Sequence, residues 1–294
     1  MSWLQLRLDV DPDTSETLED ALLAAGAVAV TLEDNADQPL LEPGVGETPL
    51  WNQTRLTGMF PADADIEGVL ANLPEGITES AQARVEILED KDWEREWMQH
   101  YRPMQFGPRL WVCPSWLEPP EPDAVNLLLD PGLAFGTGTH PTTALCLGEL
   151  DALDPAGKTL VDYGCGSGIL AVAALKLGAA RVLGIDNDPQ ALRASRDNAQ
   201  RNGIADTALP VALPGDNIEQ DYAGRADIVV ANILAGPLVA LSDPLIRFLA
   251  PSGTLLLSGL LATQSNALCE HYADRLPLSV VGEQEGWVCL RGDR

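Results

Sequence analysis

The sequence has few basic and few aromatic residues, and the first shortage limits the partners of the chain. Lysine and arginine together number 18 against 44 aspartates and glutamates, which gives a net charge of −26, and only 5% of the 294 residues are aromatic. A surface this negative repels phosphate backbones, so we expect no direct binding of nucleic acid. The acidic excess has two possible explanations. One is a basic protein partner, and the other is an acidic proteome in a salt-tolerant host. The sequence leaves both interpretations open.

Cysteine is scarce and long hydrophobic runs are absent. The five cysteines are scattered and form no C-x-x-C pair, which argues against a disulfide framework and a zinc cluster. We therefore expect reduced, mostly buried thiols and no metal site. No apolar stretch approaches the ~18 residues of a membrane span, and the first ten residues include Arg7 and Asp9 instead of a secretory signal. A soluble, cytoplasmic protein is the expectation.

The first ninety residues predict a domain of their own. The spacing of its apolar residues predicts a strand, a helix, two strands, a helix and a strand, in that order. This is the ferredoxin-like α+β arrangement. This module contains no catalytic constellation, so binding or structural support is its expected role. Its expected elements are strand 3–10, a helix capped by Asp13, strands 27–32 and 54–60, helix 66–73 and strand 83–88.

A linker is predicted between this module and the rest of the chain. In residues 91–102, Trp93, Trp97 and Tyr101 are four residues apart, which places them on one face of a helix and favours packing over ligand binding. A second domain is expected over residues 103–294.

The most informative pattern is a glycine turn between two apolar runs. The first run ends at Tyr163 and is followed by the alternate glycines Gly164, Gly166 and Gly168; the second ends in Asp186. A strand, glycine turn, helix and strand of this kind suits a nucleoside cofactor. Glycine allows close approach of the backbone, and the acid accepts hydrogen bonds from both ribose hydroxyls.

The spacing of the glycines distinguishes between cofactors. A dinucleotide fingerprint is G-x-G-x-x-G, whereas this turn is G-x-G-x-G with Asp162 two residues before it. That pattern resembles motif I of the S-adenosylmethionine-dependent methyltransferases. Asp162 suits a cationic ligand, and it also suits a carboxylate that caps the turn. An NAD-binding Rossmann protein remains an alternative.

Two further segments carry candidate site residues. Residues 130–143 combine glycines, threonines and His140 before a helical run, as in a loop that closes over a ligand at a helix start; His140 is a candidate base or a structural residue. The buried strand 226–232 ends in Asn232, which places this amide at the carboxyl edge of the sheet. The alternative is that Asn232 caps a helix near Pro237.

Together these segments closely resemble the methyltransferases of bacterial ribosomal protein L11. The resemblance rests on residues 130–143, 162–170, 184–189 and 232–237 and covers most of the chain. It implies an α/β fold: a Rossmann-like class I methyltransferase domain with a mostly parallel seven-stranded sheet at 103–294, preceded by a smaller ferredoxin-like substrate-recognition domain at 1–90. It also implies S-adenosylmethionine as cofactor and lysine ε-amines and the N-terminal α-amine of L11, a basic protein, as acceptors up to the trimethyl state.

The resemblance also assigns roles to individual residues. It places Thr143, Gly164, Asp186 and Asn232 on S-adenosylmethionine. We expect Asp186 to hold the ribose, Gly164 and Gly166 to allow close backbone approach, and Thr143 to contact the methionine end. Asn232 is expected to orient the target nitrogen as well, although Ile-Leu-Ala-Gly-Pro follows it where many amino-group methyltransferases have Pro-Pro-Tyr.

The chemistry requires little beyond geometry. Methyl transfer is an in-line displacement by nitrogen, so holding donor and acceptor collinear supplies much of the acceleration. The amine must be neutral, and water is a sufficient acceptor for its proton. Asp216 is expected near the adenine. Another amine or a small molecule is the alternative substrate.

Overall fold

The computed structural model describes residues 2–36, 50–74, 83–88, 101–130 and 140–294. It divides the chain into two compact units, Met1–Met98 and Gln99–Arg294. The expected linker helix with Trp93 and Trp97 lies outside the described residues, and so does most of the threonine-rich loop, residues 131–139. Within the described ranges, no helix is both long enough and apolar enough to cross a membrane.

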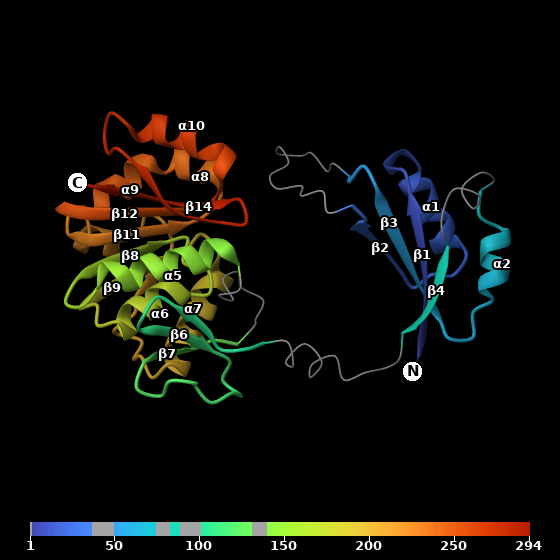
Figure 1. Ribbon diagram of the computed structural model, residues 1–294, viewed down its shortest axis with the longest axis horizontal. Coiled ribbons are helices and arrows are strands. Elements are labelled where there is room, and N and C mark those ends of the chain that lie inside the picture. Colours follow the sequence, from blue (N-terminus) through green and yellow to red (C-terminus); the bar gives the residue numbers. More distant parts are fainter. Residues whose placement is uncertain (1, 37–49, 75–82, 89–100, 131–139) are drawn as a thin grey trace. The chain divides into compact units, whose positions relative to one another are not determined.

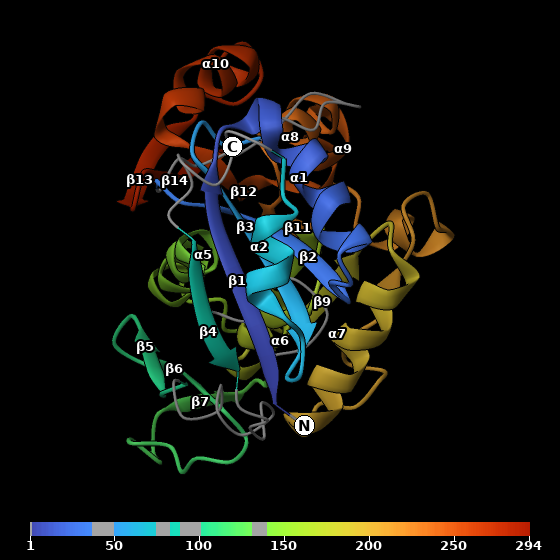
Figure 2. The ribbon, with the colours of Figure 1, turned by 90° about the vertical axis from the view of Figure 1, so that its right-hand side faces the viewer.

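The N-terminal unit is a four-stranded antiparallel sheet with two helices on one face (Figure 2). Its elements are β1 (Trp3–Val10), α1 (Pro12–Ala24), β2 (Ala29–Asp34), β3 (Thr54–Pro61), α2 (Ile66–Ala71) and β4 (Arg84–Leu88). The strand order β2-β3-β1-β4 confirms the ferredoxin-like arrangement. Alternation along β1 turns Leu6 and Leu8 toward Leu18 and Leu22 of α1, and these side chains are fully buried in the core of the unit.

The first helix begins earlier than expected. Asp11 is the N-cap of α1 and Pro12 is its first residue, so the expected cap at Asp13 is wrong. Proline has a fixed φ suited to the first helical position, and its missing N–H would have no partner there in any case. Pro12 therefore determines where the helix starts, and Asp13 lies in the first turn, where a carboxylate favours the helix dipole.

The C-terminal unit is built on a seven-stranded sheet (Figure 1). Its strands are β8 (Thr159–Tyr163), β9 (Arg181–Ile185), β10 (Val211–Ala212), β11 (Ala226–Asn232), β12 (Leu249–Leu261), β13 (Ser279–Gln284) and β14 (Trp287–Asp293). They lie in the order β10-β9-β8-β11-β12-β14-β13. The strands from β10 to β12 are parallel, and β14 is antiparallel to both of its neighbours. The mostly parallel seven-stranded sheet is confirmed.

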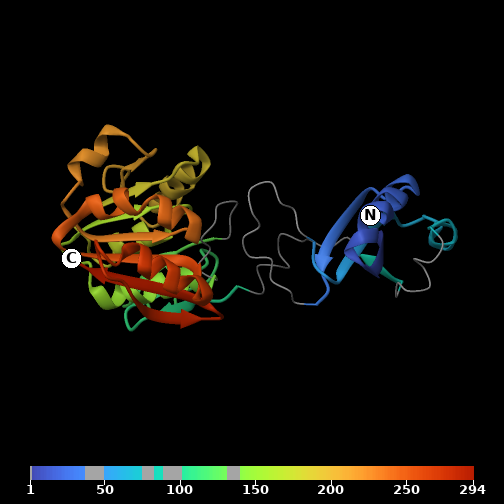
Figure 3. The same ribbon diagram turned by 90° about the horizontal axis from the view of Figure 1, so that it is seen from above.

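Helices cover both faces of this sheet (Figures 1 and 3). One face packs against α5 (Pro141–Leu153), α6 (Ile169–Lys176) and α7 (Pro189–Arg201), and the other against α8 (Ala235–Ala240), α9 (Ser242–Phe248) and α10 (Ala262–Tyr272). Strands buried on both faces need continuous apolar sequence, which the runs in β8 and β11 supply.

A separate three-stranded sheet consists of β5 (Met104–Phe106), β6 (Leu110–Cys113) and β7 (Val125–Leu128). All five cysteines are free; Cys269 is half-buried and the other four are buried.

The strand order places a ligand site between β8 and β11. The chain proceeds from β8 outward through β9 and β10 and then returns to β11 on the opposite side of β8. In open parallel sheets, ligands bind outside the carboxyl ends of the strands at such a reversal. These ends are Tyr163, Ile185 and Asn232, and the glycine turn, Asp186 and Asn232 therefore meet at one edge.

Candidate functional site

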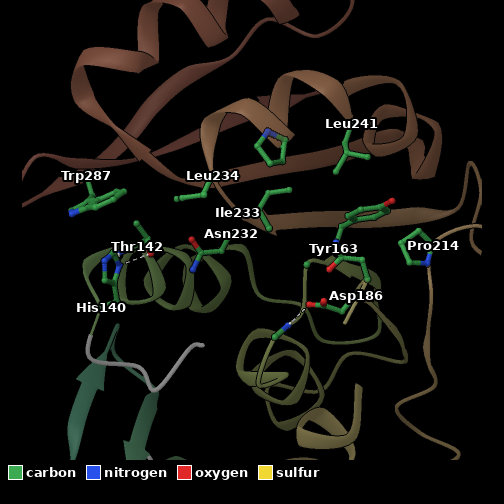
Figure 4. Close-up of a pocket in the computed structure, with 15 residues that line it drawn as sticks. His140, Thr142, Tyr163, Asp186, Pro214, Asn232, Ile233, Leu234, Leu241 and Trp287 are labelled. Carbon is green, nitrogen blue, oxygen red and sulfur yellow. Dashed lines mark hydrogen bonds between the residues drawn. The ribbon is translucent and has the colours of Figure 1, made fainter. Parts of the chain in front are cut away.

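A cavity of about 630 Å³ opens at this carboxyl edge (Figure 4). It has the size of a small-molecule site, and most of its walls are apolar. Four of the expected site residues, Gly164, Gly166, Asp186 and Asn232, line it together, and Trp287 at the start of β14 lies on one side. The described residues that line it include Gly164, Gly166, Asp186, Asn232, His140 and Trp287.

The glycine turn can be formed only without side chains. Gly164 and Gly166 have φ of +78° and +53°, in the left-handed region that favours glycine. A Cβ on Gly164 would lie 2.3 Å from Cγ2 of Ile233. Gly168 has another role, because a Cβ there would lie 2.8 Å from Oγ of Ser195 on α7. The first two glycines line the cavity, and the third allows α6 and α7 to pack closely.

Asp186 is held in place by the turn that it faces. Its Oδ2 accepts a hydrogen bond of 2.9 Å from the backbone N–H of Gly166, and its Oδ1 accepts one of 3.0 Å from the N–H of Asp188. Each carboxylate oxygen can accept more than one hydrogen bond, so this side chain retains acceptor capacity toward the cavity. Asp186 follows β9 directly, as expected.

Asn232 lines the cavity with its amide held from behind. Its Nδ2 donates to Oγ1 of Thr143 at 3.3 Å, while its Oδ1 is buried and has no hydrogen-bond partner. The N-cap of the following helix is Leu234, so Asn232 does not cap it. Thr143 is fully buried behind Asn232, and its neighbour Thr142 lines the cavity instead.

His140 and Trp287 are in contact on one side of the cavity. Their ring centroids are 4.9 Å apart and the rings are inclined by 69°, an edge-to-face arrangement. His140 is the N-cap of α5, and its Nδ1 accepts a hydrogen bond from the N–H of Thr142 at 3.3 Å. Burial lowers the pKa of His140 below its usual value, although the nearby carboxylate of Glu285 opposes this shift. The structure thus shows His140 in a structural role, as the N-cap of α5.

Asp162 lies beneath the turn and does not line the cavity. Its Oδ2 accepts a hydrogen bond from the N–H of Ala171 at 3.1 Å, and its Oδ1 is buried without a partner. Burial raises the pKa of Asp162 to about 7; the hydrogen bond from Ala171 opposes the rise, and the charge of Asp186 adds to it. A cationic ligand above the turn would favour the ionised form of this carboxyl.

The structure does not bring Asp216 to this cavity. Asp216 instead caps a short 3₁₀ helix, Asn217–Asp221, and accepts a hydrogen bond from the N–H of Ile218 at 3.0 Å. Pro214, two residues earlier, lines the cavity. Asp216 is thus absent from the described lining of the cavity, and its contact with the adenine stays a prediction.

Several lining residues were not foreseen from the sequence. Gly259 could have been found, because a glycine inside a long apolar strand indicates close backbone approach; its φ is +90°, and a Cβ there would lie 2.3 Å from the carbonyl oxygen of Ile233. Leu241 and Trp287 also line the cavity. They have no distinctive local signal, since only the tertiary fold brings them to this edge.

The donors and acceptors of the cavity fit S-adenosylmethionine. Among the described residues that line it, Asp186 is the one carboxylate and none is a lysine or arginine. The partnerless Oδ1 of Asn232 adds a buried acceptor. These groups suit a ligand that carries hydroxyl donors and positive charge.

Comparisons with known proteins agree with this fit. The family model of ribosomal protein L11 methyltransferase (PrmA) matches residues 2–294. A ribosomal protein L11 methyltransferase of Marinobacter nauticus is 54% identical over 299 residues, covering 100% of this chain and 99% of the relative. One from Escherichia coli is 56% identical over 295 residues, with 99% of each chain covered. A crystal structure of ribosomal protein L11 methylase from Lactobacillus delbrueckii subsp. bulgaricus matches with a TM-score of 0.57 and 33% identity, covering 66% of this chain and 99% of that one.

Proposed function

The chain belongs to the ribosomal protein L11 methyltransferase family, and we propose that it transfers methyl groups from S-adenosylmethionine to lysine ε-amines and the N-terminal α-amine of ribosomal protein L11 in the cytoplasm. The observation that carries the proposal is the meeting of a glycine turn, Asp186 and Asn232 in one cavity. Family membership and the G-x-G-x-G spacing of the turn favour this reaction over NAD binding.

Three groups of residues hold the cofactor in this proposal. Asp186 accepts hydrogen bonds from the ribose hydroxyls, and the bare backbone of Gly164 and Gly166 allows the ligand to lie close to the turn. The apolar surfaces of Pro214 and Leu241 lie on the Asp186 side of the cavity (Figure 4) and suit the adenine ring. Asn232 then lies toward the reacting end.

S-adenosylmethionine, when bound, supplies a methyl group on a positively charged sulfur. The sulfur keeps the electron pair of the broken S–C bond and becomes a neutral thioether. The amine must be neutral to attack, and a free lysine has a pKa of about 10.4. Apolar walls lower that pKa by desolvation. The Oδ1 of Asn232, which has no partner, accepts a hydrogen bond from the amine and orients its lone pair. The proton released after transfer goes to water.

The net charge supports a basic protein as substrate. At −26 the chain attracts cationic surfaces over distances of about a Debye length. We propose that the N-terminal unit, Met1–Met98, recognises the substrate protein, because it has a hydrophobic core of its own and its sequence contains no catalytic constellation. A methyltransferase of another amine remains the second candidate.

Thr143 has a role of its own in this proposal, as a positioning residue for Asn232. Thr143→Val removes the hydroxyl that holds the amide, and we expect turnover to fall about 3- to 10-fold, the worth of one hydrogen bond. Thr143→Ser keeps that hydroxyl and should retain most of the activity. Steady-state kinetics and calorimetry test this. An equal loss of cofactor affinity in Thr143→Val would instead assign Thr143 to direct cofactor contact.

Intact-mass spectrometry of L11 tests the proposed function. Purified L11 is incubated with the enzyme and S-adenosylmethionine, and we expect its mass to rise in steps of one methyl group. Proteolytic mapping should locate the methyl groups on lysines and on the N-terminus. An L11 mass that stays constant, while a small amine is methylated under the same conditions, would support the second candidate.

A further inference from the structure

The glycine turn needs a restraint that its own residues cannot supply. Gly164, Gly166 and Gly168 have no Cβ, which leaves room for a ligand and also leaves the φ and ψ angles of the turn free to vary. A binding loop that becomes ordered only when its ligand arrives lowers the affinity for that ligand. Contacts from outside the turn are therefore needed to hold it in the shape that lines the cavity.

Ser195 of α7 holds the carbonyl of Gly166. The Ser195 side chain is fully buried, and its Oγ donates a hydrogen bond of 3.0 Å to the carbonyl oxygen of Gly166. The N–H of the same glycine donates to Oδ2 of Asp186 at 2.9 Å. Each of the two peptide units that meet at Gly166 is thus fixed by a side chain, one from α7 and one from the residue that follows β9.

Asn198, one turn further along α7, holds the next carbonyl of the glycine turn. Its Nδ2 donates to the carbonyl oxygen of Ser167 at 2.8 Å. Its Oδ1 accepts a hydrogen bond of 2.7 Å from Nη1 of Arg201, and this contact fixes the orientation of the amide because a guanidinium can only donate. Neither Ser195 nor Asn198 is among the described residues that line the cavity, so both support the turn from behind.

Polar side chains at these two positions have a cost that only the glycine turn offsets. The other buried residues of α7 are Ala191, Leu192 and Ala199, which are apolar. A buried hydroxyl or amide destabilises a fold unless its hydrogen bonds are made. On α7 these bonds are made to two successive carbonyls of one turn, which indicates that the turn is what Ser195 and Asn198 serve.

We propose that Ser195 and Asn198 are positioning residues for the cofactor, which hold the glycine turn, and through Gly166 the carboxylate of Asp186, in the binding shape before S-adenosylmethionine arrives. This inference rests on the proposed function, which places the cofactor against the turn. A turn that has the binding shape only part of the time weakens the apparent affinity by that fraction. Loss of either side chain therefore weakens binding and leaves the rate of the saturated enzyme nearly unchanged.

Calorimetry and steady-state kinetics on the full chain test the proposal. For Ser195→Ala and for Asn198→Ala we expect the Kd and the KM for S-adenosylmethionine to rise about 3- to 10-fold, the worth of one hydrogen bond, with kcat on L11 within about twofold of wild type. Ser265→Ala is the matched control. It removes a buried hydroxyl that donates to the carbonyl of Ala262 at 2.7 Å on α10, which contributes no described residue to the lining of the cavity, and it should leave the Kd unchanged.

Two further variants separate positioning from a general loss of stability. Asn198→Asp keeps the size of the side chain and the acceptor for Arg201 but loses the donor to Ser167, so it should bind the cofactor at least as weakly as Asn198→Ala. It also carries the test if thermal unfolding shows that an alanine variant is not folded. Ser195→Ala and Asp186→Asn should together weaken binding by less than the product of their separate effects, because both act on Gly166.

Three results would overturn the positioning role. One is a wild-type Kd for S-adenosylmethionine in Ser195→Ala and in both Asn198 variants. Another is an equal loss of affinity in Ser265→Ala, which would assign the effect to the stability of the domain. The third is a product of independent effects in the double variant, which would contradict the route through Gly166. A wild-type protein that does not bind S-adenosylmethionine at all is a different outcome, since it overturns the proposed function itself.

Discussion

Asp186→Ala is expected to abolish binding of S-adenosylmethionine, with a Kd at least about 100-fold weaker than wild type. The carboxylate makes two hydrogen bonds to a ribose in the proposed function, and hydrogen bonds to charged groups are worth about 1.5–3 kcal/mol each. The substitution also removes the acceptor of the Gly166 N–H, so the turn loses its anchor. Isothermal titration calorimetry measures the effect.

Asn232→Ala is the matched control, because it changes the same cavity at the reacting end. It should keep most of the cofactor affinity and lose turnover. Asp186→Asn, which keeps the shape and loses the charge, should fall between wild type and Asp186→Ala. If Asp186→Ala bound the cofactor normally, or if both alanine variants lost affinity equally, the division of roles between the two residues would be wrong.

Removal of residues 1–98 is expected to leave cofactor binding intact and to lower kcat/KM for L11 by about 100-fold or more, because a recognising surface of ordinary size is lost. The remaining unit, Gln99–Arg294, contains the described residues that line the cavity and two hydrophobic clusters of its own, one on each face of the sheet. The N-terminal unit has a hydrophobic cluster of its own, so we expect the fragment to fold.

A short peptide that carries a target lysine provides the control for this truncation. The full chain and the fragment should methylate the peptide equally slowly, because a short peptide lacks the surface of L11 that the N-terminal unit recognises. Retention of full activity on L11 by the fragment would contradict the recognition role. Loss of cofactor affinity by the fragment would show instead that the cut disturbs the catalytic unit.

The sequence predicts those parts of the site that depend on local backbone. Gly164 and Gly166 adopt positive φ, and Asp186 and Asn232 end or follow buried strands, as their patterns indicate. These residues lie at one edge because parallel strands share the direction of their carboxyl ends. The order of elements in the N-terminal unit was predictable because it also depends on local pattern. Segments whose apolar residues recur every second position predict strands, and segments with apolar residues at helical spacing predict the helices between them.

The remainder depends on contacts between distant segments. Trp287 reaches the cavity because β14 inserts antiparallel beside β12, which no pattern near Trp287 indicates. The hydrogen bond from Asn232 to the hydroxyl of Thr143 is likewise set by the tertiary fold, and the contact of Thr143 with the cofactor stays a prediction. Asp13 is not the cap of α1, and Asp216 caps a 3₁₀ helix, because short polar side chains near helix starts serve caps and turns as readily as ligands.

A crystal structure of the protein with S-adenosylhomocysteine tests the central claim most directly. We predict that the ribose hydroxyls lie on the carboxylate of Asp186, that the adenine lies beside Pro214 and Leu241, and that the sulfur points toward Asn232 with the Trp287 side open for an amine. A ligand bound in the reverse direction, with its adenine against Trp287, or bound outside this cavity, would contradict the account.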